Sequence, residues 1–221
     1  MNAQTDVHLI AGPAGALDIA LDRPAAGVSP IGLAVIAHPH PLFGGTRDNK
    51  VVQTIARALM SRGLICLRPN FRGVGQSEGA HSLGIGEQDD LWATWQWAEA
   101  TLGANAGPSR WMAGFSFGAV MSSHLAANWE SGRAARGLPL QRLGVCLLVG
   151  LATERMSPSP PVAMTRMIHG EADDVASLAG ALDHARPFKQ PVMVLPGASH
   201  FFHGMLPELR EMVVQAVADI S

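Results

Sequence analysis

The chain has 221 residues, a formal net charge of −2, 48% hydrophobic residues and 15% charged residues. This composition excludes a disordered chain, and the length predicts one domain, residues 1–221, around a single core. Without a basic stripe, neither nucleic acid nor an anionic membrane is an expected partner. The first residues show no signal-peptide pattern, and the longest apolar run, Leu143 to Ala152, is too short to span a bilayer. We therefore expect a cytoplasmic protein.

Eight short apolar segments predict the strands of one sheet. Val7 to Ala11 and Ala16 to Leu21 flank the turn signal Gly12-Pro13-Ala14-Gly15, which predicts an antiparallel hairpin at the sheet edge. The other six segments are continuously apolar, as expected for parallel strands covered on both faces. They are Gly32 to Ala37, Leu64 to Leu67, Trp111 to Ala113, Leu143 to Val149, Met167 to Ile168 and Val192 to Leu195.

Helical periodicity lies between these strands. Val52, Ile55, Ala56 and Leu59 recur at helical spacing behind a predicted cap at Asp48. Similar patterns predict helices near Gln88 to Leu102, Ser116 to Trp129 and Val175 to Arg186, and a last one with Leu209, Val213, Ala216 and Ile220. Gly132 to Pro139 and Met156 to Val162 are expected to be loops. The alternation predicts an α/β protein with a mostly parallel eight-stranded sheet and helices on both faces.

One turn between a strand and a helix carries the pattern of a nucleophile. Gly114-Phe115-Ser116-Phe117-Gly118 follows a short apolar strand and opens a helix. Glycines two positions before and after the serine let the strand and helix approach, while the serine takes a strained conformation that exposes its hydroxyl. The sequence therefore predicts Ser116 as an attacking group.

A base and a carboxylate follow later strands. Asp173 comes after the strand that ends at Ile168, and His200 comes after the strand that ends at Leu195. Ligands of open α/β sheets bind at the carboxyl ends of strands, so these residues are expected to meet Ser116 there. The neighbours Asp174 and His203 are the alternatives. The Gly-x-x-Asp spacing favours Asp173, and a place immediately past the strand favours His200.

Further motifs extend the pattern along the chain. They are Ala37-His38-Pro39-His40-Pro41 followed by Gly44-Gly45, the run Pro69-Asn70-Phe71-Arg72-Gly73-Val74-Gly75-Gln76-Ser77, Gly84-Ile85-Gly86-Glu87, and His200-Phe201-Phe202-His203-Gly204. With the serine turn and the order Ser, Asp, His, they resemble a family of small bacterial α/β-hydrolases related to dienelactone hydrolases and carboxylesterases. The resemblance runs from about Gly12 to Ile220 and implies the α/β-hydrolase fold.

The resemblance also implies roles. Ser116 would be the nucleophile, His200 the general base and then acid, and Asp173 the carboxylate that holds the imidazole. The backbone N–H of Phe117 would be one oxyanion donor and that of His40 the other. Leu42 is the alternative to His40, because Pro39 and Pro41 have no N–H. Dienelactone hydrolases use cysteine at this turn, so the serine points to simple esters, thioesters or amides.

These observations predict a serine hydrolase that cleaves a small or short-chain carboxylic ester through an acyl-enzyme, with a small-molecule ester as its partner and no cofactor. A thioesterase, a peptidase or a ligand-binding protein on this scaffold remain alternatives. His38 and His40 could be a metal pair, but no third ligand accompanies them, so no metal is expected. Only Leu151 to Thr165 separate the sixth and seventh strands, which is too short for a folded lid and predicts an open cleft.

Overall fold

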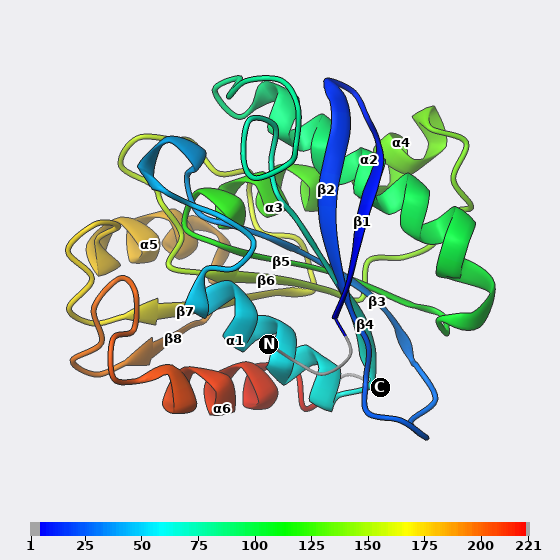
Figure 1. The fold of residues 1–221 in the computed structure, drawn as a ribbon. Coiled ribbons are helices and arrows are strands. Elements are labelled where there is room, and N and C mark those ends of the chain that lie inside the picture. The colour runs from blue at the N-terminus through cyan, green and yellow to red at the C-terminus, as the bar shows by residue number, and fades with distance from the viewer. Residues whose placement is uncertain (1–4, 220–221) are drawn as a thin grey trace.

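A single eight-stranded sheet forms the centre of the protein, with helices on both faces (Figure 1). The structure is a computed structural model that describes residues 5–219. The strand order is β1-β2-β4-β3-β5-β6-β7-β8. The strands are β1 (Thr5–Gly12), β2 (Gly15–Asp22), β3 (Gly32–Ala37), β4 (Leu64–Pro69), β5 (Ser109–Phe115), β6 (Val145–Val149), β7 (Thr165–Gly170) and β8 (Val192–Leu195). The predicted fold class is confirmed.

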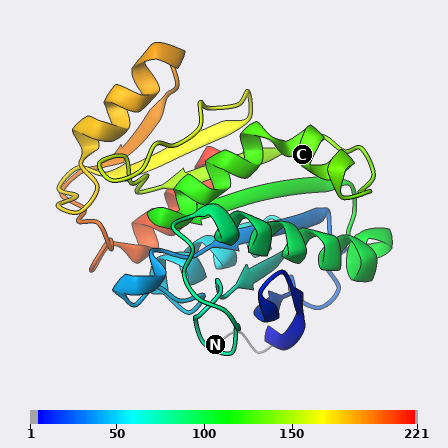
Figure 2. The same cartoon turned by 90° about the horizontal axis from the view of Figure 1, so that it is seen from above.

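Among the described residues, six α-helices cover this sheet in two layers. They are α1 (Lys50–Ser61), α2 (Ile85–Leu102), α3 (Phe117–Ala127), α4 (Trp129–Ala135), α5 (Leu178–Ala185) and α6 (Leu206–Ala216). Helices α1 and α6 pack on one face and α2 to α5 on the other, and the view from above shows α2 and α3 crossing the sheet (Figure 2). No helix within residues 5–219 is long and apolar enough to cross a membrane.

The strands build two cores because successive side chains point to opposite faces of a sheet. In β3, Leu33 and Val35 are buried against α2 and α3, whereas Ala34 and Ile36 are buried against α1. Both faces are covered, so the run from Gly32 to Ala37 can be apolar without interruption. Strands β3 to β8 pair in parallel, as the continuous apolar runs predict.

The predicted hairpin, β1 and β2, forms the end of the sheet opposite β8. Strand β1 pairs antiparallel with β2, and β2 pairs antiparallel with β4.

Strand β7 is longer than the two apolar residues that predicted it. It spans Thr165–Gly170, because Arg166 and His169 belong to the strand although they interrupt its apolar pattern.

Several helix boundaries differ from the sequence prediction; for example, α2 begins at Ile85, before the predicted Gln88. The cap of α1 is Asn49 and not Asp48, since the Asn49 carboxamide oxygen accepts the N–H groups of Val51 and Val52 at 2.9 and 3.4 Å. The helix predicted from Ser116 to Trp129 ends at Ala127, and a second helix, α4, occupies the start of the segment 132–139 expected to be a loop. Ile220, predicted on the last helix, lies outside the described residues.

Tertiary contacts with α2 explain the position of α4. The Trp129 ring stacks on Trp92 and meets the edge of Trp95. Arg133 Nη1 lies 2.8 Å from the carboxylate of Glu99, which also binds Arg110 at 2.8 Å. These contacts come from residues far away in the sequence, so a local periodicity does not reveal where the chain bends between α3 and α4.

A buried histidine ties the loop after β3 to the loop after β4. His38 is fully buried; its Nε2 accepts the N–H of Phe71 at 3.0 Å, and its Nδ1 donates to the carbonyl of Pro39 at 2.6 Å. Burial lowers the pKa of His38 to about 4. The ring is therefore neutral, as its role as an acceptor requires. Asn70 adds a second link, because it accepts from the Arg47 N–H at 2.9 Å.

We predict that His38 makes the stability of the protein depend on pH. The unfolded chain protonates this histidine near pH 6.5, whereas the folded protein does so only near pH 4. Stability is therefore lost as the pH falls between these values, by about 2 to 3 kcal/mol at pH 4.5. Urea unfolding at pH 7 and 4.5 should show that loss in the wild type and a smaller one in His38→Gln, which keeps an acceptor. An equal loss in both proteins would contradict the assignment.

Candidate active site

Ser116 lies on a strained turn between β5 and α3. Its φ and ψ are 57° and −119°, a conformation that few residues other than glycine adopt. The flanking glycines permit it: a Cβ on Gly114 would lie 2.2 Å from the Gly118 carbonyl oxygen, and one on Gly118 would lie 2.3 Å from the Ala37 carbonyl oxygen. The Ser116 N–H donates to the Val149 carbonyl at 2.9 Å. The turn predicted from the glycine spacing is therefore present.

The structure brings together the three side chains that the sequence singled out. The Ser116 hydroxyl lies 3.0 Å from Nε2 of His200, and Nδ1 of His200 lies 2.7 Å from Oδ2 of Asp173. The three residues follow β5, β8 and β7, whose carboxyl ends meet at one edge of the sheet. With Nδ1–H donating to the carboxylate, Nε2 is free to accept the serine proton.

The two alternatives are not part of this hydrogen-bonded chain. Asp174 is exposed and lines the cleft beside Ser116. His203 is exposed, and its ring lies against the ring of Phe201. Of the two adjacent carboxylates, Asp173 is the buried one and reaches His200, because neighbouring residues of the loop point in different directions.

Hydrogen bonds keep Asp173 ionised in spite of its burial. Burial by itself would raise its pKa, but the bonds from His200 and from backbone N–H groups prevail and lower the pKa below its usual value. Oδ1 accepts the N–H of Val175 at 3.0 Å and that of Ala176 at 2.8 Å. An anion fixed in this way stabilises a positive charge on the His200 ring.

Aromatic rings and a glycine fix the His200 ring. Its centroid lies 4.8 Å from the ring of Phe115 and 5.0 Å from that of Phe201. On a third side, a Cβ on Gly150 would come within 3.4 Å of the His200 ring and 3.1 Å of Phe115. Gly150 also has a positive φ of 55°, which glycine adopts without strain. The sequence did not single out this glycine.

Two backbone N–H groups beside Ser116 are free to donate. Those of Phe117 and His40 have no hydrogen-bond partner within residues 5–219. The N–H of Leu42, the other predicted donor, is occupied by Nδ1 of His40 at 3.2 Å. Both His40 and Phe117 line the cleft that contains Ser116.

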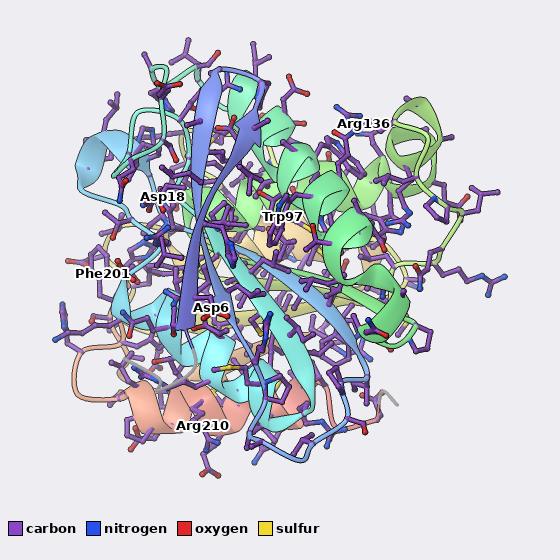
Figure 3. The ribbon with its side chains drawn as sticks, turned by 45° about the vertical axis from the view of Figure 1, so that its right-hand side comes forward. Asp6, Asp18, Trp97, Arg136, Phe201 and Arg210 are labelled. Atoms are coloured by element: carbon purple, nitrogen blue, oxygen red, sulfur yellow. The ribbon has the colours of Figure 1, made fainter. Side chains whose placement is uncertain are left out.

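This cleft has a volume of about 470 Å³ and opens to solvent. Its apolar wall is formed by Pro39, Phe43, Phe117, Ala152, Met156, Val175 and Phe201, and its charged side chains are Glu154, Arg155 and Asp174. The segment 150–164, between β6 and β7, contains no helix and contributes part of the rim. Figure 3 shows Phe201 on the opposite side of the molecule from Arg136.

Other polar residues of the motifs have structural partners. The Arg72 guanidinium binds the Asp90 carboxylate, with Nη2 and Oδ1 2.8 Å apart. Both ring nitrogens of His38 contact backbone groups.

No three His, Cys, Asp or Glu side chains in the described part of the chain are placed to hold a metal ion. Sequence reasoning gave His169 no role, although this buried residue contacts the Asp173 loop.

Comparisons with known proteins relate this chain to serine hydrolases. The family model described as X-Pro dipeptidyl-peptidase (S15 family) matches residues 16–135. The structure of an α/β serine hydrolase homologue from Coxiella burnetii is 36% identical, with 97% of this chain and 98% of that chain covered and a TM-score of 0.83. An α/β serine hydrolase without a lid from Xanthomonas campestris is 33% identical, with 99% and 95% covered and a TM-score of 0.82.

A third relative, an uncharacterized protein from Rickettsia prowazekii, is 29% identical over 213 residues, which cover 91% of this chain and 84% of that protein. The resemblance inferred from the motifs is confirmed by these matches. The chain belongs to the α/β serine hydrolases, within the family that the X-Pro dipeptidyl-peptidase (S15) model describes.

Proposed function

We propose that this protein is a serine esterase that hydrolyses small carboxylic esters through an acyl-enzyme. The observation that carries the proposal is the unbroken hydrogen-bonded chain from Ser116 through His200 to Asp173, which ends at an open cleft. The nucleophile, base and orienting carboxylate are each within hydrogen-bond reach of the next, as nucleophilic catalysis requires.

In the first half of the proposed reaction, Ser116 Oγ attacks the ester carbonyl while His200 Nε2 takes the hydroxyl proton. Asp173 stabilises the imidazolium that forms. The carbonyl oxygen becomes an oxyanion, and the free N–H groups of Phe117 and His40 donate to it. His200 then gives its proton to the departing alcohol, leaving the acyl group on Ser116.

In the second half, water takes the place of the alcohol. His200 removes a proton from the water, the hydroxide attacks the acyl-enzyme carbonyl, and the same two N–H groups stabilise the second oxyanion. Ser116 regains its proton from His200 as the acid leaves. These steps use only the three side chains, two backbone groups and water.

We predict that His200→Ala and Asp173→Asn lower kcat about ten-thousandfold or more, because each removes one member of a unit that acts together. His203→Ala and Asp174→Asn, which change the adjacent exposed residues, should stay within a few-fold of the wild type. Steady-state kinetics on p-nitrophenyl acetate measures all four. If the ranking within either pair is reversed, the role belongs to the other residue.

The cleft also predicts a preference for short acyl groups. The rim segment 150–164 has no helix to roof the cleft, so added methylenes remain in contact with water. A buried methylene contributes about 0.8 kcal/mol, or about fourfold in kcat/KM. For p-nitrophenyl esters from two to twelve carbons, kcat/KM should peak early and then fall. A steady rise to long chains would require a closed apolar channel and would contradict the open cleft.

A peptidase is a second candidate, supported by the family match and by the charges in the cleft. A substrate with a free amino terminus needs a carboxylate, and Asp174 lines the cleft without an ion-pair partner among residues 5–219. Glu154 is less available, because it accepts the Ser177 N–H at 2.6 Å. Faster turnover of Xaa-Pro p-nitroanilides than of short esters, reduced by Asp174→Asn, would favour the peptidase; the esterase proposal expects the opposite order.

A further inference from the structure

His169 is a buried polar residue that the proposed mechanism does not use. It is the penultimate residue of β7, just before the loop that carries Asp173, and only 1% of its surface is exposed. A buried imidazole is costly unless its N–H is hydrogen-bonded, so its partners show what holds it in place.

Its Nε2 faces two groups of the Asp173 loop. It donates to the carbonyl oxygen of Ala176 at 2.7 Å and lies 3.4 Å from Oδ2 of Asp173. Ala176 is itself fully buried and donates its N–H to the other carboxylate oxygen, Oδ1, at 2.8 Å. The His169 side chain therefore closes a ring of contacts that runs through Ala176 to Asp173.

We infer that His169 is a positioning residue that sets the orientation of the Asp173 carboxylate toward His200. Oδ2 is the oxygen that accepts from His200 at 2.7 Å, and Nε2 of His169 lies 3.4 Å from the same oxygen. Oδ1 is held by the loop backbone, and His169 holds that backbone through the Ala176 carbonyl. Without the His169 side chain, both carboxylate oxygens of Asp173 lose support, although no group that touches the substrate is removed.

The kinetic consequence rests on the proposed function. A misplaced carboxylate holds the imidazole less well in the transition state, and small displacements of this kind cost up to about a hundredfold in rate. Substrate binding in the cleft does not involve His169. Loss of the His169 side chain should therefore lower kcat and leave KM nearly unchanged.

The test compares His169→Leu with His169→Gln, whose side-chain amide can still donate to the Ala176 carbonyl. The control is Ile168→Ala, the preceding buried residue, which packs in the core beneath α1 and α6. We expect His169→Leu to lower kcat on p-nitrophenyl acetate about 10- to 100-fold with KM within twofold. His169→Gln should recover most of kcat. Ile168→Ala should lower the melting temperature but keep kcat.

A second readout does not depend on ester turnover. The proton between His200 and Asp173 should give a low-field proton NMR signal, identified by its loss in His200→Gln. We expect this signal in the wild type and in His169→Gln, and its loss or broadening in His169→Leu at temperatures where that variant is folded. An unchanged signal, or a kcat for His169→Leu equal to that of His169→Gln, would overturn the inference. If the wild type hydrolyses no ester, the esterase proposal fails and the NMR comparison still decides the role of His169.

Discussion

The close approach of three backbone segments at the Ser116 turn is the constraint on which the site depends. The space beside Gly118 is filled by the Ala37 and His38 carbonyls at the end of β3, and the space beside Gly114 by the start of α3. Any side chain at either position would separate these segments. Because they touch, the strained serine, the N–H of Phe117 and the loop carrying His40 all lie around one cleft.

Histidines that take no part in the proposed reaction hold this arrangement together. His38 joins the loops after β3 and β4 through backbone bonds, and His169 holds the loop after β7. The ring of His124, on α3, lies 2.8 Å from the hydroxyl of Ser159, which ties the rim segment 150–164 to the helix that follows the nucleophile. Burial lowers the pKa of His38 and of His124, which favours neutral rings. The imidazoles of His38, His124 and His169 thus act as structural connectors, whereas the ring of His200 lies against the serine hydroxyl.

The parts of the fold that follow from local chemistry could be predicted from the sequence. The bounds of β3 and β8 coincide with their apolar runs, because both strands are flanked by turn residues. The glycine spacing located Ser116, and the ends of two strands located Asp173 and His200. Contacts between distant segments could not be predicted in the same way. The break between α3 and α4 depends on packing against α2, and the place of His169 depends on a loop that folds back over β7.

Between neighbouring residues the sequence indicated a preference, and the structure gives its physical reason. Asp173 and Asp174 are chemically identical in the sequence, and only the backbone bonds of the loop turn one inward. His40 was the predicted second donor and Leu42 its alternative; in the structure the imidazole of His40 accepts the Leu42 N–H, which leaves the N–H of His40 to face the cleft. Sequence patterns identify the loop that supplies a group, whereas the hydrogen bonds of the folded chain identify the residue.

The central claim is that Ser116 is a nucleophile activated by His200, and labelling with a fluorophosphonate tests it most directly. The reagent reacts with an activated serine hydroxyl, so the test can be made without knowing the enzyme's natural ester. Mass spectrometry of the intact protein and of its peptides should show one adduct per chain, on Ser116, and none in Ser116→Ala. Labelling of another residue, or no labelling of the folded wild-type protein, would contradict the account.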